Sequence, residues 1–386
     1  MGMKDLKPLL TIGTVFIFSS NVSAWRPFFP STHGEITAKA ISNMDHNQYP
    51  DMIRASDRLI DGSASERAHE GLHTKGGAPK DWWEGKREAT HGGVLTNYRM
   101  LMFKNAYKNL GRVAHITEDQ AVPSHVANIP HDVLTPDGLE SFAMHNKEID
   151  PLPSIENNLM PYEYYQMLQD ETRSGITGWI NPSNKKHYWV VSKKALPLGK
   201  DNTFGPTGRY GGSNNSFIDS PIPALCRNRL AAAAGYAKAL FEAASKKLPP
   251  LVMNLKVSPN LAAPGQATKI SFTALENRTA KVRYAVILRR KDSQAETILA
   301  GETGLRAPGK EGYLFEGNIS LTWAGALSGK AAAEGSYSLE VELTDEDGNT
   351  VPPEVNTDAI TENDSKTVLT ILSTEANETP ASISFQ

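Results

Sequence analysis

The sequence predicts a mainly α-helical N-terminal domain, a helical bundle, followed by a C-terminal all-β sandwich of immunoglobulin-like type. Two observations lead to this prediction. Apolar residues recur at helical spacing in the first part of the chain, whereas short strand-like runs fill the last part. All ten histidines lie between His33 and His187, so the composition changes at the same place. We therefore expect domains at 25–248 and 251–386, divided by the KKLPPL stretch at 246–251.

The two periodicities are clear in individual segments. Phe103, Tyr107, Leu110 and Ala114 follow one helical face, and the alanine-rich run at 229–248 is a second helix. Further on, KISFTAL, VRYAVILRR, YSLEVEL and KTVLTIL have strand composition and are separated by Gly, Pro, Asn and Asp. The DEDGN stretch at 345–349 lies between two of these strands, which favours a hairpin turn over a calcium loop.

The first 24 residues have the features of a signal peptide. Lys4 and Lys7 precede the apolar run LLTIGTVFIF, and Val22-Ser23-Ala24 is a small-residue cleavage site. An apolar run this short favours a removed leader over a membrane span. We expect cleavage after Ala24, a mature chain that begins at Trp25, and a secreted or periplasmic location.

Charge and cysteine content exclude some classes of protein. The formal net charge is -3, and removal of the leader adds no basic excess, which argues against a general nucleic-acid binder. Cys226 is the single cysteine, so no intramolecular disulfide is possible and we expect no disulfide-linked partner. Stability must come from burial or from metal.

The stretch LGRVAHITEDQAVPSHVAN at 110–128 carries the clearest chemical signal. His115 and Asp119 are four residues apart, so both project from one helical face and can hold one cation. Pro123 limits this helix, and His125 can return from the turn to a second ion. Imidazole and carboxylate together favour zinc among the common ions.

Other histidines and carboxylates gather in the same part of the chain. The segment ASERAHEGLH contains Glu66, His69 and His73, and the segment HDVLTPDGLESF contains His131 and Glu140. His33 lies near the expected mature N-terminus. This density, confined to one predicted domain, favours a site with several metal ions over a chance surface cluster.

The order of an N-terminal Trp, an early Thr-His, a central LGxxxHxxxDxxxPxH and a later Glu-containing helix resembles the zinc-dependent phospholipases C and the related fungal zinc nucleases. The resemblance implies two to three zinc ions. It implies that the amine and carbonyl of Trp25 chelate one zinc together with His33, and that Asp119 bridges this ion to the zinc of His115. It assigns His125 and Glu140 to a third zinc.

The resemblance is incomplete at two positions. Where the family has a His four residues before the Glu, this chain has Pro136, and His131 is the substitute. Glu66 fits the family's acidic position, where it would bind metal and orient or deprotonate the attacking water, with Asp61 as a further candidate. Either His73 or His69 would be the following ligand, and the choice stays open.

These expectations favour a secreted zinc metallohydrolase that cleaves phosphodiester bonds. The favoured substrate is a phosphatidylcholine-like lipid, and the β-domain would dock the enzyme to a membrane surface. A zinc-dependent nuclease acting on single-stranded nucleic acid is one alternative, although the chain offers no basic track. A non-catalytic protein stabilised by zinc is the other alternative.

Overall fold

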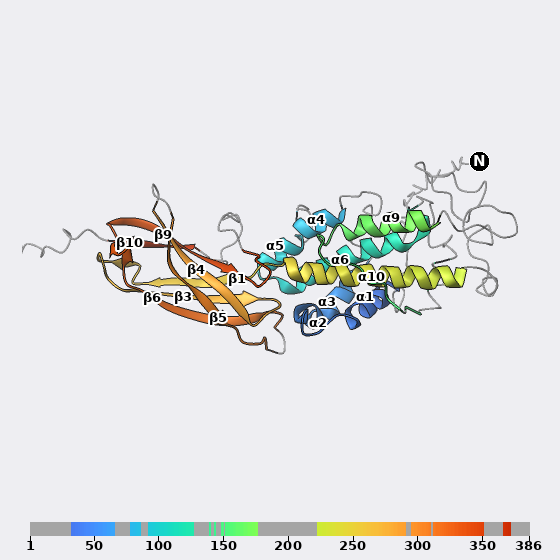
Figure 1. Ribbon diagram of the computed structural model, residues 1–386, viewed down its shortest axis with the longest axis horizontal. Coiled ribbons are helices and arrows are strands. Elements are labelled where there is room, and N and C mark those ends of the chain that lie inside the picture. The colour runs from blue at the N-terminus through green and yellow to red at the C-terminus, as the bar shows by residue number, and fades with distance from the viewer. Residues whose placement is uncertain are drawn as a thin grey trace, which may run out of the picture.

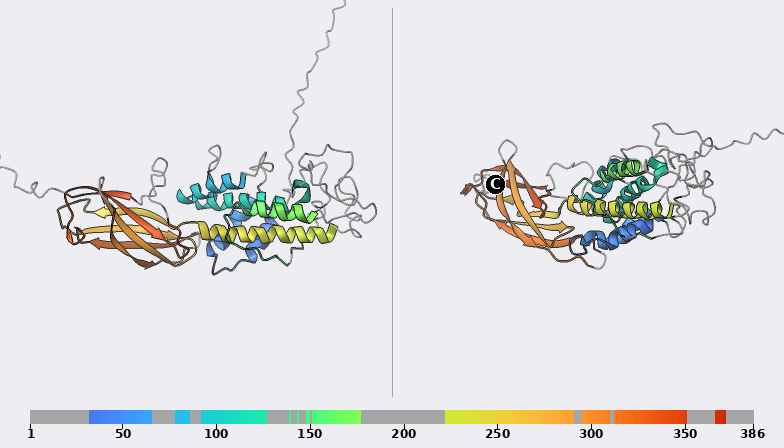
Figure 2. Two further views of the ribbon diagram at one scale, coloured as in Figure 1. Left: turned by 45° about the horizontal axis from the view of Figure 1, so that its top comes forward. Right: turned by 45° about the vertical axis from the view of Figure 1, so that its right-hand side comes forward.

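The computed structural model combines helices and sheets in one elongated molecule. Helices gather at one end and strands at the other (Figure 1), and Figure 2 shows the same arrangement from two further directions. None of the helices in the described part of the chain is both long enough and apolar enough to cross a lipid bilayer. The structure describes residues 32–65, 78–85, 92–126, 139, 143, 148–149, 151–176, 222–290, 295–309, 312–350 and 366–371.

Helices occupy the described chain up to residue 247. They are α1 (Thr32–Ser42), α2 (Pro50–Arg54), α3 (Ser56–Ser63), α4 (Ala78–Glu84), α5 (Val94–Arg99), α6 (Phe103–Glu118), the 3-10 turn η2 (Asp119–Ala121), α7 (Pro123–Val126), α9 (Tyr164–Ile176) and α10 (Ile222–Lys247). In α6 the residues of the expected apolar face, Tyr107, Leu110 and Ala114, are buried. Pro123 is the first residue of α7, a position that needs no backbone N–H donor.

Helices α3 and α6 approach each other through two glycines. A Cβ on Gly62 would lie 2.0 Å from the carbonyl oxygen of Lys108, and a Cβ on Gly111 would lie 2.2 Å from the carbonyl oxygen of Leu59. Side chains larger than hydrogen therefore do not fit at this crossing. The close approach brings the carbonyl of Ser63, the last residue of α3, against His115 in the last turn of α6.

Strands follow from residue 251 in three sheets. They are β1 (Leu251–Ser258), β2 (Leu261–Ala262), β3 (Thr268–Glu276), β4 (Lys281–Arg290), β5 (Glu296–Gly304), β6 (Phe315–Trp323), β7 (Ala326–Leu327), β8 (Lys330–Ala331), β9 (Gly335–Thr344) and β10 (Lys366–Ile371). The strand orders are β1-β3-β6, β2-β10-β9-β4-β5 and β7-β8. The β2–β10 pair is parallel, and the other paired strands are antiparallel.

One of two buried apolar clusters among the described residues joins the helices to the strands, and the other consists of residues from the strand-rich part alone. Leu251, Leu275 and Leu314 come from the strand-rich part of the chain, yet they belong to the same cluster as Leu59 and Leu110 of the helices. The apolar surface that these leucines bury is therefore removed from water by both parts together.

Buried and partly buried hydrogen bonds also join the helical part to the strand-rich part, across a boundary that we call the seam. Asn277 donates through Nδ2 to Oδ2 of Asp51 at 3.0 Å and to the carbonyl of Ser245 at 2.8 Å. Arg54 donates from Nε and Nη2 to the carbonyl of Tyr313, at 2.9 and 2.7 Å. Because hydrogen-bonding groups that are buried need partners, these contacts tie the two parts to one relative position.

The predicted fold class is therefore corrected. The chain is a mixed structure of helices and several sheets, and not a helical bundle followed by an independent immunoglobulin-like sandwich. The physical reason is the shared core, which local periodicity cannot reveal because it depends on contacts between distant segments. The expected domain limits of 25–248 and 251–386 stay predictions.

Candidate metal centre

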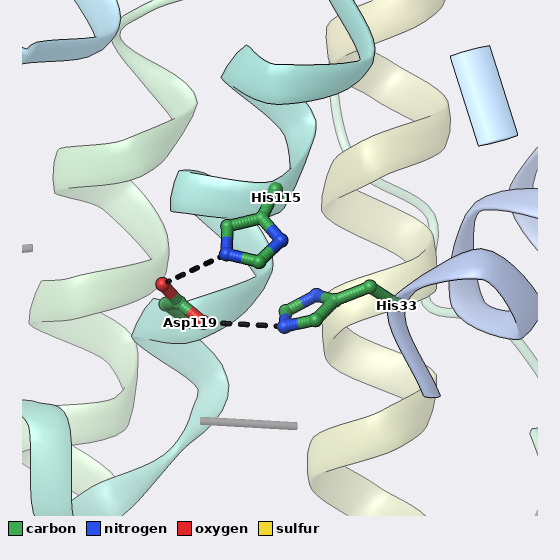
Figure 3. Close-up of side chains that lie close together, drawn as sticks. All are labelled: His33, His115 and Asp119. Atoms are coloured by element: carbon green, nitrogen blue, oxygen red, sulfur yellow. Dashed lines mark ion pairs between the residues drawn. The ribbon is translucent and has the colours of Figure 1, made fainter. Parts of the chain in front are cut away.

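Three side chains meet in the interior of the helical part. His33 comes from α1, His115 from α6, and Asp119 from the first position of η2. One ligand atom from each lies within 4.8 Å of the other two, and all three residues are buried. Figure 3 shows both imidazoles turned toward the carboxylate of Asp119.

Each oxygen of Asp119 faces one histidine. Nε2 of His33 lies 3.4 Å from Oδ1, and Nε2 of His115 lies 3.7 Å from Oδ2. The two imidazole rings face each other at a tilt of 32°, with 3.9 Å between their centroids. The three groups therefore surround one small space with two nitrogen atoms and one carboxylate.

The opposite nitrogen of each imidazole is anchored. Nδ1 of His33 lies 2.7 Å from Oε2 of Glu118, and Nδ1 of His115 lies 2.6 Å from the carbonyl oxygen of Ser63. A carbonyl or carboxylate oxygen accepts hydrogen bonds, so Nδ1 is the donor in both pairs. This arrangement turns Nε2 of both rings toward Asp119, as in histidines that bind metal through Nε2.

The surrounding carboxylates dominate the electrostatics. Burial by itself lowers the pKa of His33, but the hydrogen bonds and charges of Asp119 and Glu118 outweigh burial and raise this pKa to about 10. In the metal-free protein a proton on His33 therefore balances part of the negative charge at neutral pH. A metal cation would replace this proton, since a histidine ligand must be deprotonated to bind.

His33, His115 and Asp119 can together hold a metal ion. Their donor atoms suit a transition metal, and burial excludes the solvent that competes for exposed carboxylates. Three protein ligands leave at least one coordination position of a tetrahedral ion for water or substrate.

Two further candidates from the sequence lie in the described chain but outside this group. His125 lies in α7 and is half-buried, and it is not one of the three residues whose ligand atoms converge. Asp61 lies on α3, where it pairs with Nζ of Lys108 at 2.8 Å and is largely exposed. The remaining candidates lie outside the described residues: Trp25, Glu66, His69, His73, His131 and Glu140.

Sequence reasoning missed the groups that hold the ligands. Glu118 stands next to Asp119 in the motif, but its partner His33 is 85 residues away, and no spacing rule connects them. The Ser63 contact is made by a backbone carbonyl, which has no sequence signature. Tyr165 of α9 is a further neighbour, since after burial the Asp119 charge raises the pKa of this phenol.

Comparisons with known proteins give little support for any family. No family model and no curated protein matches the chain. A solved structure of Pseudomonas fluorescens alkylpurine DNA glycosylase AlkC, bound to DNA containing an abasic site analogue, aligns at 11% identity with a TM-score of 0.21. That alignment covers 89% of this chain and 96% of the glycosylase. A similarity this weak carries no argument about fold or activity.

The predicted family is therefore corrected. No family model and no curated protein supports a zinc-dependent phospholipase C or a fungal zinc nuclease, and the solved structure described above is a DNA glycosylase. The motif around His115 is short, and the same local pattern can arise wherever a helix carries a metal ligand pair. A function for this chain must therefore be supported by the geometry of the site itself.

Proposed function

We propose that the chain is a zinc-dependent hydrolase of phosphodiester bonds. The observation that supports the proposal is the buried group of His33, His115 and Asp119, whose ligand atoms lie within 4.8 Å of one another. Two imidazoles and one carboxylate are a ligand set that zinc accepts, and three ligands are typical of catalytic zinc sites with an open position.

The residues have separate roles in this proposal. Asp119 and the two histidines would hold the ion, and Glu118 and Ser63 hold the histidines. A bound zinc ion would lower the pKa of a water molecule to about 7 and would supply positive charge for the phosphate oxygens. Glu66, which lies outside the described residues, stays the proposed general base. Two to three ions per chain are proposed because other histidines and carboxylates share this part of the sequence.

A phosphatidylcholine-like lipid is the substrate we propose first. The formal net charge of -3 offers no basic excess for binding a nucleic acid backbone, which makes single-stranded nucleic acid the second choice. The strand-rich part from residue 251 onward is the proposed contact with the membrane surface. We further propose export with cleavage after Ala24, which mass spectrometry of the mature chain would test.

The test combines metal content with hydrolysis. Purified protein is analysed for zinc and assayed on phosphatidylcholine vesicles, single-stranded DNA and a soluble p-nitrophenyl phosphodiester. We expect bound zinc and lipid hydrolysis, and we expect loss of both in His115→Ala and Asp119→Asn. His46→Ala is the matched control, because His46 is an exposed histidine away from the group.

Each result of this test has a distinct meaning. Hydrolysis of DNA alone would replace the lipase assignment with a nuclease. Zinc-loaded protein that cleaves none of the three substrates would show a non-catalytic zinc site. Full activity with at most trace metal would refute the proposal.

A further inference from the structure

We propose that Glu118 is a positioning residue of the metal centre, whose negative charge strengthens metal binding through His33. This inference uses the metal site of the proposed function, but it does not depend on which reaction the site performs. The observation that carries it is a buried carboxylate that contacts a ligand histidine on the side away from the metal group.

Both oxygens of Glu118 are engaged, and both partners lie on α1. Oε2 lies 2.7 Å from Nδ1 of His33, and Oε1 accepts a hydrogen bond from Oγ1 of Thr37 at 2.7 Å. His33 and Thr37 are four residues apart and therefore lie on one face of the helix. The carboxylate cannot rotate without breaking both contacts, so it holds the His33 ring in one orientation.

Two consecutive residues thereby enclose one imidazole. Glu118 contacts Nδ1 of His33, and Asp119 faces Nε2 of the same ring at 3.4 Å. Glu118 is completely buried, so neither water nor salt screens its charge. Glu118 thus holds the His33 ring through Nδ1, the nitrogen opposite the metal group, and is not itself one of the three residues of that group.

The two ligand histidines differ in what supports them. His115 donates to the neutral carbonyl of Ser63, whereas His33 donates to the carboxylate of Glu118. A carboxylate behind Nδ1 makes Nε2 a more basic and stronger ligand than a carbonyl does. Glu118 and Asp119 together also supply two negative charges, which balance a buried divalent cation. We therefore expect the charge of Glu118, and not only its shape, to set the metal affinity.

Glu118→Gln separates charge from shape. A glutamine can accept from His33 through its carbonyl oxygen and donate to the Thr37 hydroxyl, so it can keep both contacts without the charge. Loss of a residue that supports a metal ligand typically weakens metal binding by about 10- to 100-fold. We expect about 10-fold weaker zinc binding for Glu118→Gln and about 100-fold for Glu118→Ala. Thr37→Val, which leaves the contact between Glu118 and His33 intact, should weaken zinc binding less than Glu118→Gln does.

The experiment measures zinc affinity without any substrate. The full chain is freed of metal, and zinc binding is measured at one fixed pH by competition with a chromophoric chelator. Urea unfolding of the metal-free proteins is measured in parallel. The inference is supported if Glu118→Gln binds zinc about 10-fold more weakly while its metal-free form unfolds at nearly the wild-type urea concentration.

Wild-type zinc affinity in Glu118→Gln would overturn the inference, because the charge would then have no effect. If Glu118→Ala does not fold, Glu118→Gln and Thr37→Val still decide the question. The variants could show the expected order of zinc affinities although the wild-type protein hydrolyses none of the three substrates. That result would support this inference and refute only the proposed reaction. A wild-type chain that binds no zinc would refute both.

Discussion

Replacing Gly62 with alanine tests whether the glycine crossing of α3 and α6 positions the metal centre. The added Cβ would lie 2.0 Å from the carbonyl oxygen of Lys108, whereas ordinary contacts begin at 3.4 Å. The atom in the way belongs to the backbone and cannot rotate aside, so an ordinary contact would require the two helices to separate by roughly 1.4 Å.

The expected cost follows from two opposing effects. Overpacking of this kind costs about 1–3 kcal/mol, and an immovable backbone contact belongs at the upper end. Alanine has a higher helix propensity than glycine, which returns up to about 1 kcal/mol. We expect Gly62→Ala to lower the free energy of unfolding by about 2 kcal/mol. Because Ser63 follows directly, its 2.6 Å contact with His115 should lengthen beyond hydrogen-bonding distance.

Urea unfolding of the metal-free protein and zinc affinity are the two measurements. Gly175→Ala is the matched control, because Gly175 lies on α9 and an added Cβ there meets nothing within 4 Å. This control should be neutral or stabilised by up to about 1 kcal/mol, with unchanged zinc affinity. If Gly62→Ala were as stable as the control and bound zinc equally well, the crossing would not position the centre.

Three further predictions concern the seam and the metal. Burial raises the pKa of Glu276 to about 8, so the folded protein binds a proton that the unfolded chain releases near pH 4.5. The contribution of Glu276 to the free energy of unfolding is therefore complete below about pH 4.5. It is lost as the pH rises to about 8, by up to about 5 kcal/mol. Urea unfolding at several pH values should show a smaller decline in Glu276→Gln, and an equal decline would contradict this cause. Arg54→Ala removes two hydrogen bonds to the Tyr313 carbonyl and should cost about 1–3 kcal/mol in the same assay; an unchanged urea midpoint would argue against a tied seam. Removal of zinc by a chelator should lower the thermal midpoint reversibly. The expected loss in free energy of unfolding is about 2.7 kcal/mol relative to protein with zinc at 100 times its Kd. A midpoint unaffected by chelator would argue against a metal in the core.

The sequence by itself determined the features that depend on neighbouring residues. Helical spacing predicted the buried face of α6, and the interval of four placed His115 and Asp119 on one side of its end. Short runs of strand composition, separated by Gly, Pro, Asn and Asp, predicted strands after Pro250. These features follow from the geometry of a single helix or strand, so a local pattern is enough to predict them.

Tertiary structure decided which of the expected ligands come together. The resemblance linked His33 to His115 through Asp119, and these three residues do meet because α1 packs against α6 and α10. His125, which the resemblance assigned to a third ion and which is only six residues after Asp119, lies outside the group. The contact of Glu118 with His33 joins residues of α6 and α1 that no sequence spacing relates.

The fold class needed tertiary information for the same reason. Leu251, Leu275 and Leu314 have the composition of ordinary strand residues, yet they are buried in the cluster that the helices form. Periodicity shows which face of an element is apolar, but it does not show which other element covers that face. That choice depends on packing between segments far apart in the chain, where a close fit, as between Gly62 and Gly111, decides which elements come together.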